Sequence, residues 1–512
     1  MSAHLEVERA YAIEVGEELP DLSAVPGVVT IGPPRTTVLV ARYFDTDDLA
    51  LVRHGVSLRR RTGGPDEGWH LKVPAAIGRV EVHHRLGKRD DVVPVGLARQ
   101  VRGWSRGREL RPVAEIETER TTFDLRDADG VVVAEVADDR VAGRVLPPPD
   151  AAEGSAGDAG WRRWREVEVE LVGAAPEFLD DVDRLLAEHG IEPRAEQRKV
   201  GSVLADRLGA VPSPGRLGPM RPASRVLHRR LQDQLDALLR ADFDARRGAP
   251  DGVHRLRVVC RRLRGALVTF RPLFDRAVTD PIRAELRWVA RSLGASRDVE
   301  VAQERLPGLV DRLPADQVHG PVRRRLTRAR AEGRRATATA ALEVLDSPRY
   351  LRLLARLEQL AADPPWTAKA ERPAGRVLLR RLHRDRDRLR ARVVAAAEIE
   401  AAEGPGSRLD AARHDVRKAA KRLRYAGETL KPLGDRDAKA LRRDAKRLTQ
   451  LLGERQDTAL TRAELRRLAA EASAAGESAF TYGVLHAREE ARAAQLESEA
   501  AAVWEELDQD PD

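Results

Sequence analysis

The chain is poor in cysteine, and this scarcity alone excludes several kinds of site. Cys260 is the one cysteine in 512 residues, so neither an internal disulfide nor a zinc site built on a Cys-x-x-Cys pair can form. No G-x-x-x-x-G-K-[ST] segment occurs, which excludes the phosphate-binding loop of many nucleotide hydrolases. No uninterrupted apolar run approaches the roughly 18 residues that span a bilayer, and the charged start lacks the apolar segment of a signal peptide. We therefore expect a cytoplasmic protein that is not integral to a membrane.

Lysine is also scarce, and the charge is divided unevenly along the chain. Only 9 of the 90 basic side chains are lysines. The arginine excess can reflect genomic base composition, but the planar guanidinium also suits recognition of phosphate and carboxylate groups. Residues 1–210 contain 29 basic and 38 acidic side chains, a net −9, whereas residues 211–512 contain 61 and 44, a net +17. The rear part is therefore expected to attract polyanions.

Proline and glycine mark a domain boundary. The segment 209–222, GAVPSPGRLGPMRP, holds four prolines and three glycines without apolar periodicity, which is typical of a linker. It divides the chain into residues 1–208 and 223–506. In the front part, short alternating runs predict about eight strands of an antiparallel sheet or barrel, and a helix is expected at 176–190. The expected strands cover 4–11, 36–44, 55–61, 69–73, 79–85, 112–123, 131–136 and 165–172.

The rear part reads as helical and internally repeated. Leu, Ala and Arg recur at helical spacing for almost 300 residues, which predicts a bundle of about eight or more helices. VHRLRVVCRRLRGAL (253–267) aligns without a gap with RHDVRKAAKRLRYAG (413–427). LGASRD (293–298) and LGERQD (452–457) follow at nearly equal distances. Two matches in the same order, about 160 residues apart, indicate two related sub-bundles.

Each copy of the repeat carries a basic stripe. In the first copy, His254 and three arginines follow one another at steps of 3, 4 and 3, and the second copy repeats these steps from His414. At about 100° per residue, each set stays within roughly 80° of the helix surface. Stacked like charges repel, and a polyanion would remove that cost. The alternatives are a solvated face neutralised by acids of adjacent helices and histidines bonded to nearby carboxylates.

These paired motifs resemble the two histidine-containing halves of a CHAD domain, over about residues 222–505. The resemblance implies two pseudo-symmetric four-helix bundles that bind inorganic polyphosphate in a basic groove. It also points to an association with polyphosphate granules. Carried over by position, the implied polyphosphate ligands are His254, Arg257, Arg261, Arg262, Arg264, His414, Arg417, Lys418, Lys421, Arg422 and Arg424.

In the front part, acidic and basic residues alternate on the expected strands. Glu6 and Glu8 share one strand face, as do Glu166, Glu168 and Glu170, and several basic residues align similarly. Each strand alone could face solvent. Closed into a barrel, the strands would instead line a lumen with carboxylates and guanidinium groups, which suits a phosphate chain bridged by hard divalent cations.

The order of HLEVERAY, YFDT, LRRR, LKVP, AEVADDRV, EVEVELVG and QRKVGSVL resembles a CYTH domain, a triphosphate tunnel metalloenzyme, over about residues 4–205. The resemblance implies an eight-stranded antiparallel tunnel, and the whole chain is expected to be an α+β multidomain protein. A divalent metal, Mg²⁺ or Mn²⁺, would be held by Glu6, Glu8, Glu168 and Glu170, with Glu6 and Glu8 also catalytic; Glu81 and Asp138 are weaker additions. The implied triphosphate ligands are Arg59, Arg61, Lys72, Arg85, Arg120 and Lys199.

The sequence departs from the family signature Glu-x-Glu-x-Lys, because Ala10 stands where the lysine is expected. Arg9 cannot replace that lysine, since strand alternation points it to the other face. The acidic run Glu115, Glu117 and Glu119 is expected to make the lumen still less positive. Both features weaken the case for turnover.

Three hypotheses follow from the sequence. The first is a protein that binds polyphosphate through its helices and triphosphate with metal in its tunnel, where it hydrolyses phosphoanhydrides. The second is a binding or targeting protein with a degenerate, non-catalytic tunnel. The third is nucleic-acid binding, which the net charge permits; however, the rear part has few aromatic residues for base stacking and no base-reading motif.

Overall fold

The computed structural model describes residues 2–87, 92–147, 160–194, 199–209, 217–404 and 406–508. The side chains of Ser2, residues 295–301 and Asp508 lie outside this description, and so do residues 197–198 of the QRKVGSVL motif. The chain forms two compact units, Met1–Ser213 and Pro214–Asp512. Among the described residues, no helix is both long enough and apolar enough to cross a membrane.

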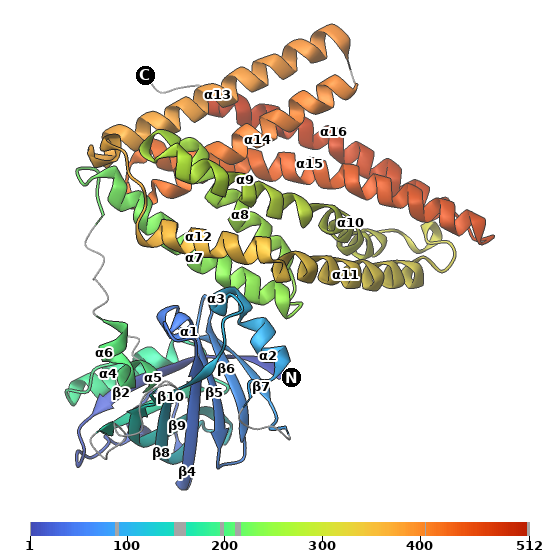
Figure 1. Ribbon diagram of the computed structural model, residues 1–512. Helices are drawn as coiled ribbons and strands as arrows, with labels where there is room; N and C mark the ends of the chain where they lie inside the picture. Colours follow the sequence, from blue (N-terminus) through green and yellow to red (C-terminus); the bar gives the residue numbers. More distant parts are fainter. Residues whose placement is uncertain are drawn as a thin grey trace. The chain divides into compact units, whose positions relative to one another are not determined.

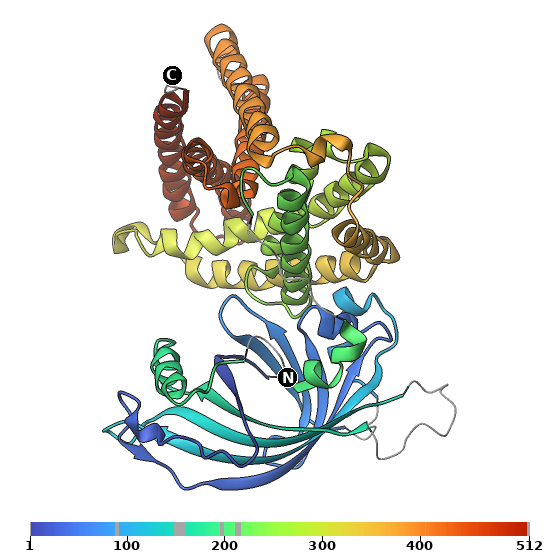
Figure 2. The same cartoon turned by 90° about the vertical axis from the view of Figure 1, so that its left-hand side faces the viewer.

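The first unit is an antiparallel sheet that curls into a barrel (Figure 2). Its strands are β1 (Ser2–Glu6), β2 (Glu8–Ile13), β3 (Thr30–Ile31), β4 (Arg35–Asp45), β5 (Ser57–Thr62), β6 (Gly68–Pro74), β7 (Arg79–His84), β8 (Arg111–Arg126), β9 (Val132–Val145) and β10 (Arg162–Leu171). Their order is β1-β7-β6-β5-β4-β8-β9-β10-β2, and β3 pairs with β8. Every expected strand is present.

The first two strands close the barrel. β1 pairs with β7 and β2 pairs with β10, so one N-terminal stretch, interrupted at Val7, joins the two edges of the sheet. If β1 and β2 are counted as one strand, the barrel is a circuit of eight strands, as predicted, and β3 pairs with β8 outside this circuit. Closure matters because, among the described residues, it pairs both edges of the sheet and separates an inner from an outer face along the strands of the circuit.

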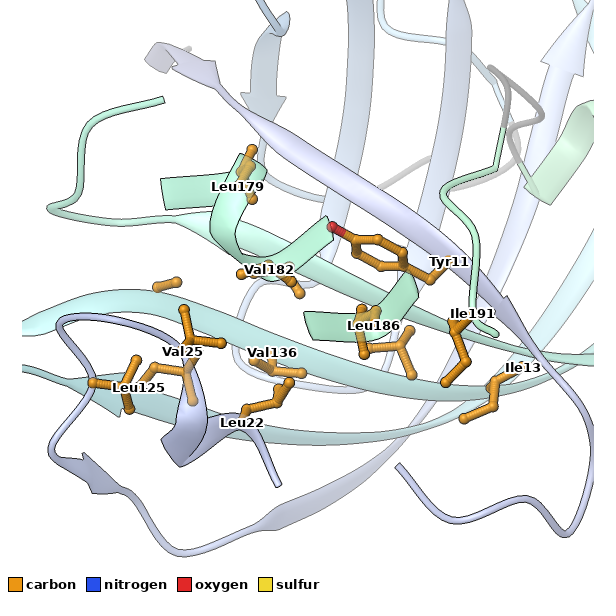
Figure 3. Packing of buried hydrophobic residues seen from close by; sticks show 14 residues of the cluster. Tyr11, Ile13, Leu22, Val25, Leu125, Val136, Leu179, Val182, Leu186 and Ile191 are labelled. Carbon is orange, nitrogen blue, oxygen red and sulfur yellow. The ribbon is translucent and has the colours of Figure 1, made fainter. Parts of the chain in front are cut away.

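The outer face is apolar beside β2 and β10 (Figure 3). Tyr11 and Ile13 of β2 pack with Val136 of β9 against α4 (Phe178–Glu188), whose Leu186 is fully buried. Because successive side chains of a strand alternate, the residues between these apolar ones point into the barrel. The short helices of this unit are η1 (Leu22–Ala24), α1 (Ala50–Arg53), α2 (Val95–Gln100), α3 (Arg102–Ser105), α5 (Lys199–Val203) and α6 (Ala205–Leu208).

The second unit is helical (Figure 1). Its α-helices are α7 (Ala223–Arg246), α8 (Gly252–Thr269), α9 (Arg276–Ser292), α10 (Gly294–Val310), α11 (Val322–Asp346), α12 (Pro348–Ala362), α13 (Ala374–Glu403), α14 (Ser407–Thr429), α15 (Arg436–Ala474) and α16 (Phe480–Asp508). Its 3-10 turns are η3 (Arg271–Leu273), η4 (Ala315–Gln317), η5 (Ala368–Glu371) and η6 (Lys431–Leu433). Together with the barrel, these helices confirm the predicted α+β class.

The predicted internal repeat is visible in the helices. α8, η3 and the Asp275 cap of α9 recur 160 residues later as α14, η6 and the Asp435 cap of α15. The N-terminal ends of α7 and α13 also contact each other reciprocally: the Ala223 amide donates to the Arg372 carbonyl, and the Ala374 amide donates to the Arg221 carbonyl. α9 and α10, divided at Leu293, together occupy the place of the continuous α15, and α12 is an addition to the first half.

Candidate functional site

The inner face of the barrel gathers the acidic and basic side chains expected of a tunnel. The register aligns Glu8 of β2 with Glu170 of β10, and Glu6 of β1 with Arg79 of β7. Arg9, between the two glutamates, lies outside the barrel, where its guanidinium contacts Asp180 and Asp183 of α4. Strand alternation therefore gave the correct face for all three residues.

Lys72 lies between the two N-terminal glutamates. Its Nζ atom is 2.6 Å from Oε2 of Glu6 and 3.7 Å from Oε2 of Glu8. Arg79 Nη1 lies 3.9 Å from Oε1 of Glu8. The side chains of Glu6 and Lys72 are mostly buried, so their attraction is weakly screened by water. The predicted pair Glu6 and Glu8 is thus brought together with the predicted Lys72, and Arg79 joins the group.

Glu6 also contacts Glu81, and a histidine lies on each side of this carboxyl pair. Burial, followed by the contact with Glu81, raises the pKa of Glu6 from 4.5 to about 8, against the attraction of Lys72. Burial acts to raise the pKa of Glu81 as well, but hydrogen bonds from His70 and Glu6 hold it below its ordinary value. Nδ1 of His70 lies 2.8 Å from Oε1 of Glu81, and Nε2 of His4 lies 3.5 Å from Oε2. Glu81, a weaker candidate from the sequence, is therefore part of the site.

A second buried cluster surrounds Lys199, the first residue of α5. Its Nζ atom lies 2.5 Å from Glu168, 2.6 Å from Glu166 and 2.8 Å from Asp139. Burial alone would lower the pKa of Lys199, but these carboxylates raise it above its ordinary value. Arg120 contacts both Asp139 and Glu168 at 2.6 Å. Sequence reasoning missed Asp139, because it favoured its neighbour Asp138, which is on the outer face and pairs with Arg165.

Lys199 brings a positive charge to the place where the signature lysine is absent. Ala10 of β2 is the register partner of Glu168, so a lysine at position 10 would project toward that carboxylate. The Arg194 amide donates to the Ala10 carbonyl at 2.8 Å, which places Arg194 beside β2. The lumen therefore retains an amine near Glu168, supplied from a distant part of the chain.

The acidic run on β8 does not enter the lumen, contrary to expectation. Glu115 pairs with Arg42 and Arg144 and Glu119 with Arg140, all on the outer face. Arg120 has the opposite parity and points inward, because adjacent strand residues face opposite sides. The expectation that this run makes the lumen less positive was therefore wrong.

The remaining predicted cations of the barrel differ in position. Arg59 and Arg61 of β5 face inward; Nη1 of Arg59 donates to the Tyr43 hydroxyl at 3.3 Å. Arg61 pairs with Asp66, and burial followed by the charges of Arg59 and Arg120 lowers its pKa to about 9. Arg85 is exposed beyond the end of β7, outside this group.

A divalent cation fits only part of the predicted ligand set. Glu168 is held by Lys199 and Arg120, which together keep its pKa well below the ordinary value despite burial. Glu8 and Glu170 are register partners, and Glu135 of β9 lies opposite Glu170 on the other side. Burial raises the pKa of Glu170, and the charges of Glu8, Glu81 and Glu135 add to this. By register, these carboxylates offer the oxygen ligands that a hard cation prefers. Oxygens of Asp139, Glu166 and Glu168 also lie within 4.8 Å of one another, but that cluster is already neutralised by the protein's own cations.

In the helical unit, the two predicted stripes meet where α8 packs on α14. Gly265 of α8 permits this approach, since a Cβ there would lie 3.3 Å from the Tyr425 ring. Burial, followed by the charges of Arg417 and Arg261, lowers the pKa of Lys421 to about 7. Nε of Arg261 is buried without a hydrogen-bond partner among the described residues. The structure thus concentrates positive charge from both halves.

Two cations of α9, Arg283 and Arg287, add to the positive charge near the stripe on α8. Burial and the charges of Arg287 and Arg283 lower the pKa of Arg264. Sequence reasoning missed both residues, although their spacing of four along α9 was a usable signal. Arg257 lies beside Gly294, where a Cβ would be 3.5 Å from Nη2.

Other members of the predicted polyphosphate set are exposed or paired with acids. His254 and His414 are exposed at the start of their stripes. Arg262 and Arg424 contact Glu428, Arg422 contacts Asp385, and the exposed Lys418 contacts Asp415. The alternative interpretation, neutralisation by acids of adjacent helices, therefore holds for Arg262 and Arg422, whereas Lys418 and Arg424 pair with acids of their own helix.

Comparisons with known proteins identify a different family in each part of the chain. A family model described as CYTH domain matches residues 4–200, and one described as CHAD domain matches residues 229–466. Two Mycobacterium tuberculosis proteins, MT2285 and Rv2226, are each 34% identical over 513 residues, covering 99% of this chain and 96% of theirs.

Solved structures are similar over parts of the chain. PptA from Streptomyces chartreusis covers 56% of this chain and 99% of its own, with 24% identity and a TM-score of 0.44. The putative adenylyl cyclase HpAC1 from Hippeastrum, described as having a dominant triphosphatase activity, covers 41% and 98%, with 15% identity and a TM-score of 0.21.

Proposed function

The chain belongs to the proteins that carry a CYTH domain followed by a CHAD domain, and from this membership we propose a division of labour between its two units. The barrel binds inorganic triphosphate together with a divalent cation, Mg²⁺ or Mn²⁺, and hydrolyses the phosphoanhydride. The helical unit binds inorganic polyphosphate.

The observation that carries the barrel proposal is the contact between opposite charges inside one closed lumen. Lys72 touches both Glu6 and Glu8, and Arg79 reaches Glu8. A metal–triphosphate complex offers each of these groups a new partner: phosphate oxygens for the cations and the metal for the carboxylates. Such a complex can therefore replace these contacts without leaving a buried charge uncompensated, and the proton that Glu6 holds in the free barrel would leave as the metal binds.

The chain's own residues would divide the work by charge. Arg59 and Arg61 on β5, with Lys72 and Arg79 nearby, would hold the phosphate oxygens and absorb negative charge that develops during phosphoryl transfer. Glu8 and Glu170 would hold the cation, which when bound supplies Lewis-acid stabilisation of the phosphoryl oxygens. The closed barrel would restrict the orientation of the substrate and so align the scissile bond.

For the helical unit, the supporting observation is the close approach of Arg261 and Lys421 from the two halves. Lys421 carries a lowered pKa because burial and neighbouring cations disfavour its charge. A polyanion bound over the basic faces of α8 and α14 would reverse that effect, since phosphate oxygens favour the protonated amine.

Phosphate release from tripolyphosphate tests the barrel proposal. The full-length protein is assayed with Mg²⁺ or Mn²⁺ beside the double variant Glu6→Ala/Glu8→Ala, with folding of both checked by circular dichroism. We expect release that requires the metal and is lost in the double variant. Release that survives in the double variant would show that the site is elsewhere. No release from a folded wild-type protein would support the binding protein with a degenerate tunnel.

Polyphosphate binding tests the second part. Arg261→Ala/Lys421→Ala is compared with Arg255→Ala, a control on the same helix whose guanidinium pairs with Asp244 outside the stripe. We expect weaker binding in the double variant and a salt dependence whose log–log slope falls by about 1 per lost cation. Equal affinity in all three proteins would refute the assignment, and preference for nucleic acid at equal phosphate concentration would favour the third hypothesis.

A further inference from the structure

His4 occupies a position that the proposed triphosphatase site does not use. It is the register partner of Glu81 in the β1–β7 pair and shares its strand face with Glu6. Its Nε2 atom lies 3.5 Å from Oε1 of Glu6 and 3.5 Å from Oε2 of Glu81. About half of its side chain is exposed, whereas both carboxylates are buried. The imidazole is therefore the part of this group that is open to solvent.

The other oxygen of each carboxylate is already engaged. Lys72 contacts Oε2 of Glu6 at 2.6 Å, and Nδ1 of His70 contacts Oε1 of Glu81 at 2.8 Å. Nε2 of His70 in turn lies 3.0 Å from the Asp66 carbonyl, which fixes the ring. Outer-shell contacts of this kind orient metal ligands in proteins. A cation bound to the two oxygens that face His4 would replace the proton that Glu6 and Glu81 share.

The two distances from His4 Nε2 to the carboxylate oxygens match a small tetrahedral metal site. Bonds of about 2.0–2.2 Å to nitrogen and oxygen place neighbouring ligand atoms roughly 3.3–3.6 Å apart in a tetrahedron. The two distances from His4 fall in that range, and all three ligand atoms lie within 4.8 Å of one another. Three protein ligands leave a fourth position for water or a phosphate oxygen.

We propose that His4, Glu6 and Glu81 form a site for a borderline transition-metal cation, of the class of Zn²⁺ or Co²⁺, distinct from the carboxylate row at Glu8 and Glu170. An imidazole nitrogen suits these ions and is a poor ligand for Mg²⁺, which prefers oxygen. The proposal shares Glu6 with the proposed triphosphatase site and rests on that site only for the use of metal in the lumen.

Cobalt spectroscopy of the full-length protein tests the site without reference to activity. Co²⁺ bound in a tetrahedral nitrogen–oxygen site absorbs visible light far more strongly than octahedral Co²⁺. We expect strong visible bands in the wild type, their loss in His4→Ala, and Zn²⁺ affinity at least about 10–100-fold lower in that variant. His84→Ala is the control, because His84 lies on the other face of β7 near the Arg85 carbonyl and is expected to retain the bands. Equal spectra and affinities in the wild type and His4→Ala would refute the proposal.

A second variant covers the case in which His4→Ala folds poorly. His4→Cys replaces one transition-metal ligand with another, and bound Co²⁺ would then show a thiolate charge-transfer band in the near ultraviolet. Absence of this band in a folded His4→Cys protein would contradict the site.

Glu8→Gln distinguishes this inference from the proposed function. It removes a carboxylate of the triphosphatase site but none of the three ligands at His4, so the cobalt bands should persist while phosphate release falls. His4-dependent bands in a protein without phosphate release would uphold the site and refute hydrolysis. Phosphate release without such bands would refute the site alone.

Discussion

The buried amine of Lys199 permits a quantitative prediction. Three carboxylates, Asp139, Glu166 and Glu168, contact it, while Arg120 and Arg194 supply two further cations to the same cluster. Three charges of each sign balance one another. Lys199→Met therefore leaves one uncompensated negative charge in a site where Asp139 and Glu166 are almost fully buried.

Breaking a buried ion pair from one side costs about 3–5 kcal/mol. Because two arginines remain in the cluster, we expect a value near 3 kcal/mol for Lys199→Met. For a unit of roughly 200 residues, this lowers the melting temperature by about 6–12 °C, at 2–4 °C per kcal/mol. Differential scanning calorimetry of the full-length protein measures it, and the shift should be confined to the transition of the barrel.

Two controls make the result decisive. Arg140→Met changes the residue next to Asp139 on the outer face, where Arg140 pairs with exposed Glu119 at 3.5 Å, and should cost at most about 1 kcal/mol. Adding Glu168→Gln to Lys199→Met removes the surplus charge and should recover part of the loss. If Lys199→Met melts within 2 °C of Arg140→Met, the balance of three positive and three negative charges is not what holds the cluster together.

Three further predictions concern pH and backbone. Polyphosphate affinity should fall as pH rises through about 7, because the ligand favours protonated Lys421. Calorimetric titration in buffers of different ionisation heats should show uptake of at most one proton on binding, and Lys421→Arg should abolish this proton uptake. The pKa of Glu6 is raised to about 8 in the folded barrel from 4.5 when unfolded. Between these values the folded state holds the extra proton, so the free energy of unfolding should fall as pH rises, by at most about 1.4 kcal/mol per pH unit. Urea denaturation at several pH values should show a flatter profile in Glu6→Gln. Gly78 has a φ of +65°, and a Cβ there would lie 1.9 Å from the Glu6 carbonyl oxygen. Gly130 has a similar φ, but a Cβ there would meet no atom within 4 Å. In urea denaturation, Gly78→Ala should therefore destabilise the barrel clearly more than Gly130→Ala.

The faces of the barrel could be predicted from the sequence because they depend on local alternation. Glu6 and Glu8 had to share a face, and Arg9 had to lie opposite, whatever the strands paired with. The repeat was equally readable, since a gapless match at His254 and His414 fixes the spacing of the equivalent helices. Both inferences use only distances along the chain.

Partners across strands and helices could not be read in this way. The acidic run beginning at Glu115 was expected in the lumen, but its face depends on which neighbouring residue of β8 points inward, and Arg120 does. Arg262 and Arg422 belong to the repeated motif, yet Glu428 and Asp385 neutralise them from positions set by helix packing. Such pairings require the register between elements.

By itself, the sequence determined the two kinds of unit, the strand faces and the repeat, because hydrophobic periodicity and residue spacing are properties of neighbouring residues. The tertiary structure alone decided that Lys199 lies beside Glu168 opposite Ala10, and that His4 faces Glu6 and Glu81. His4 and Glu6 meet Glu81 because β1 pairs with β7, and Lys199 reaches Glu168 because α5 packs against β8 and β9; both arrangements join residues that lie far apart in the chain.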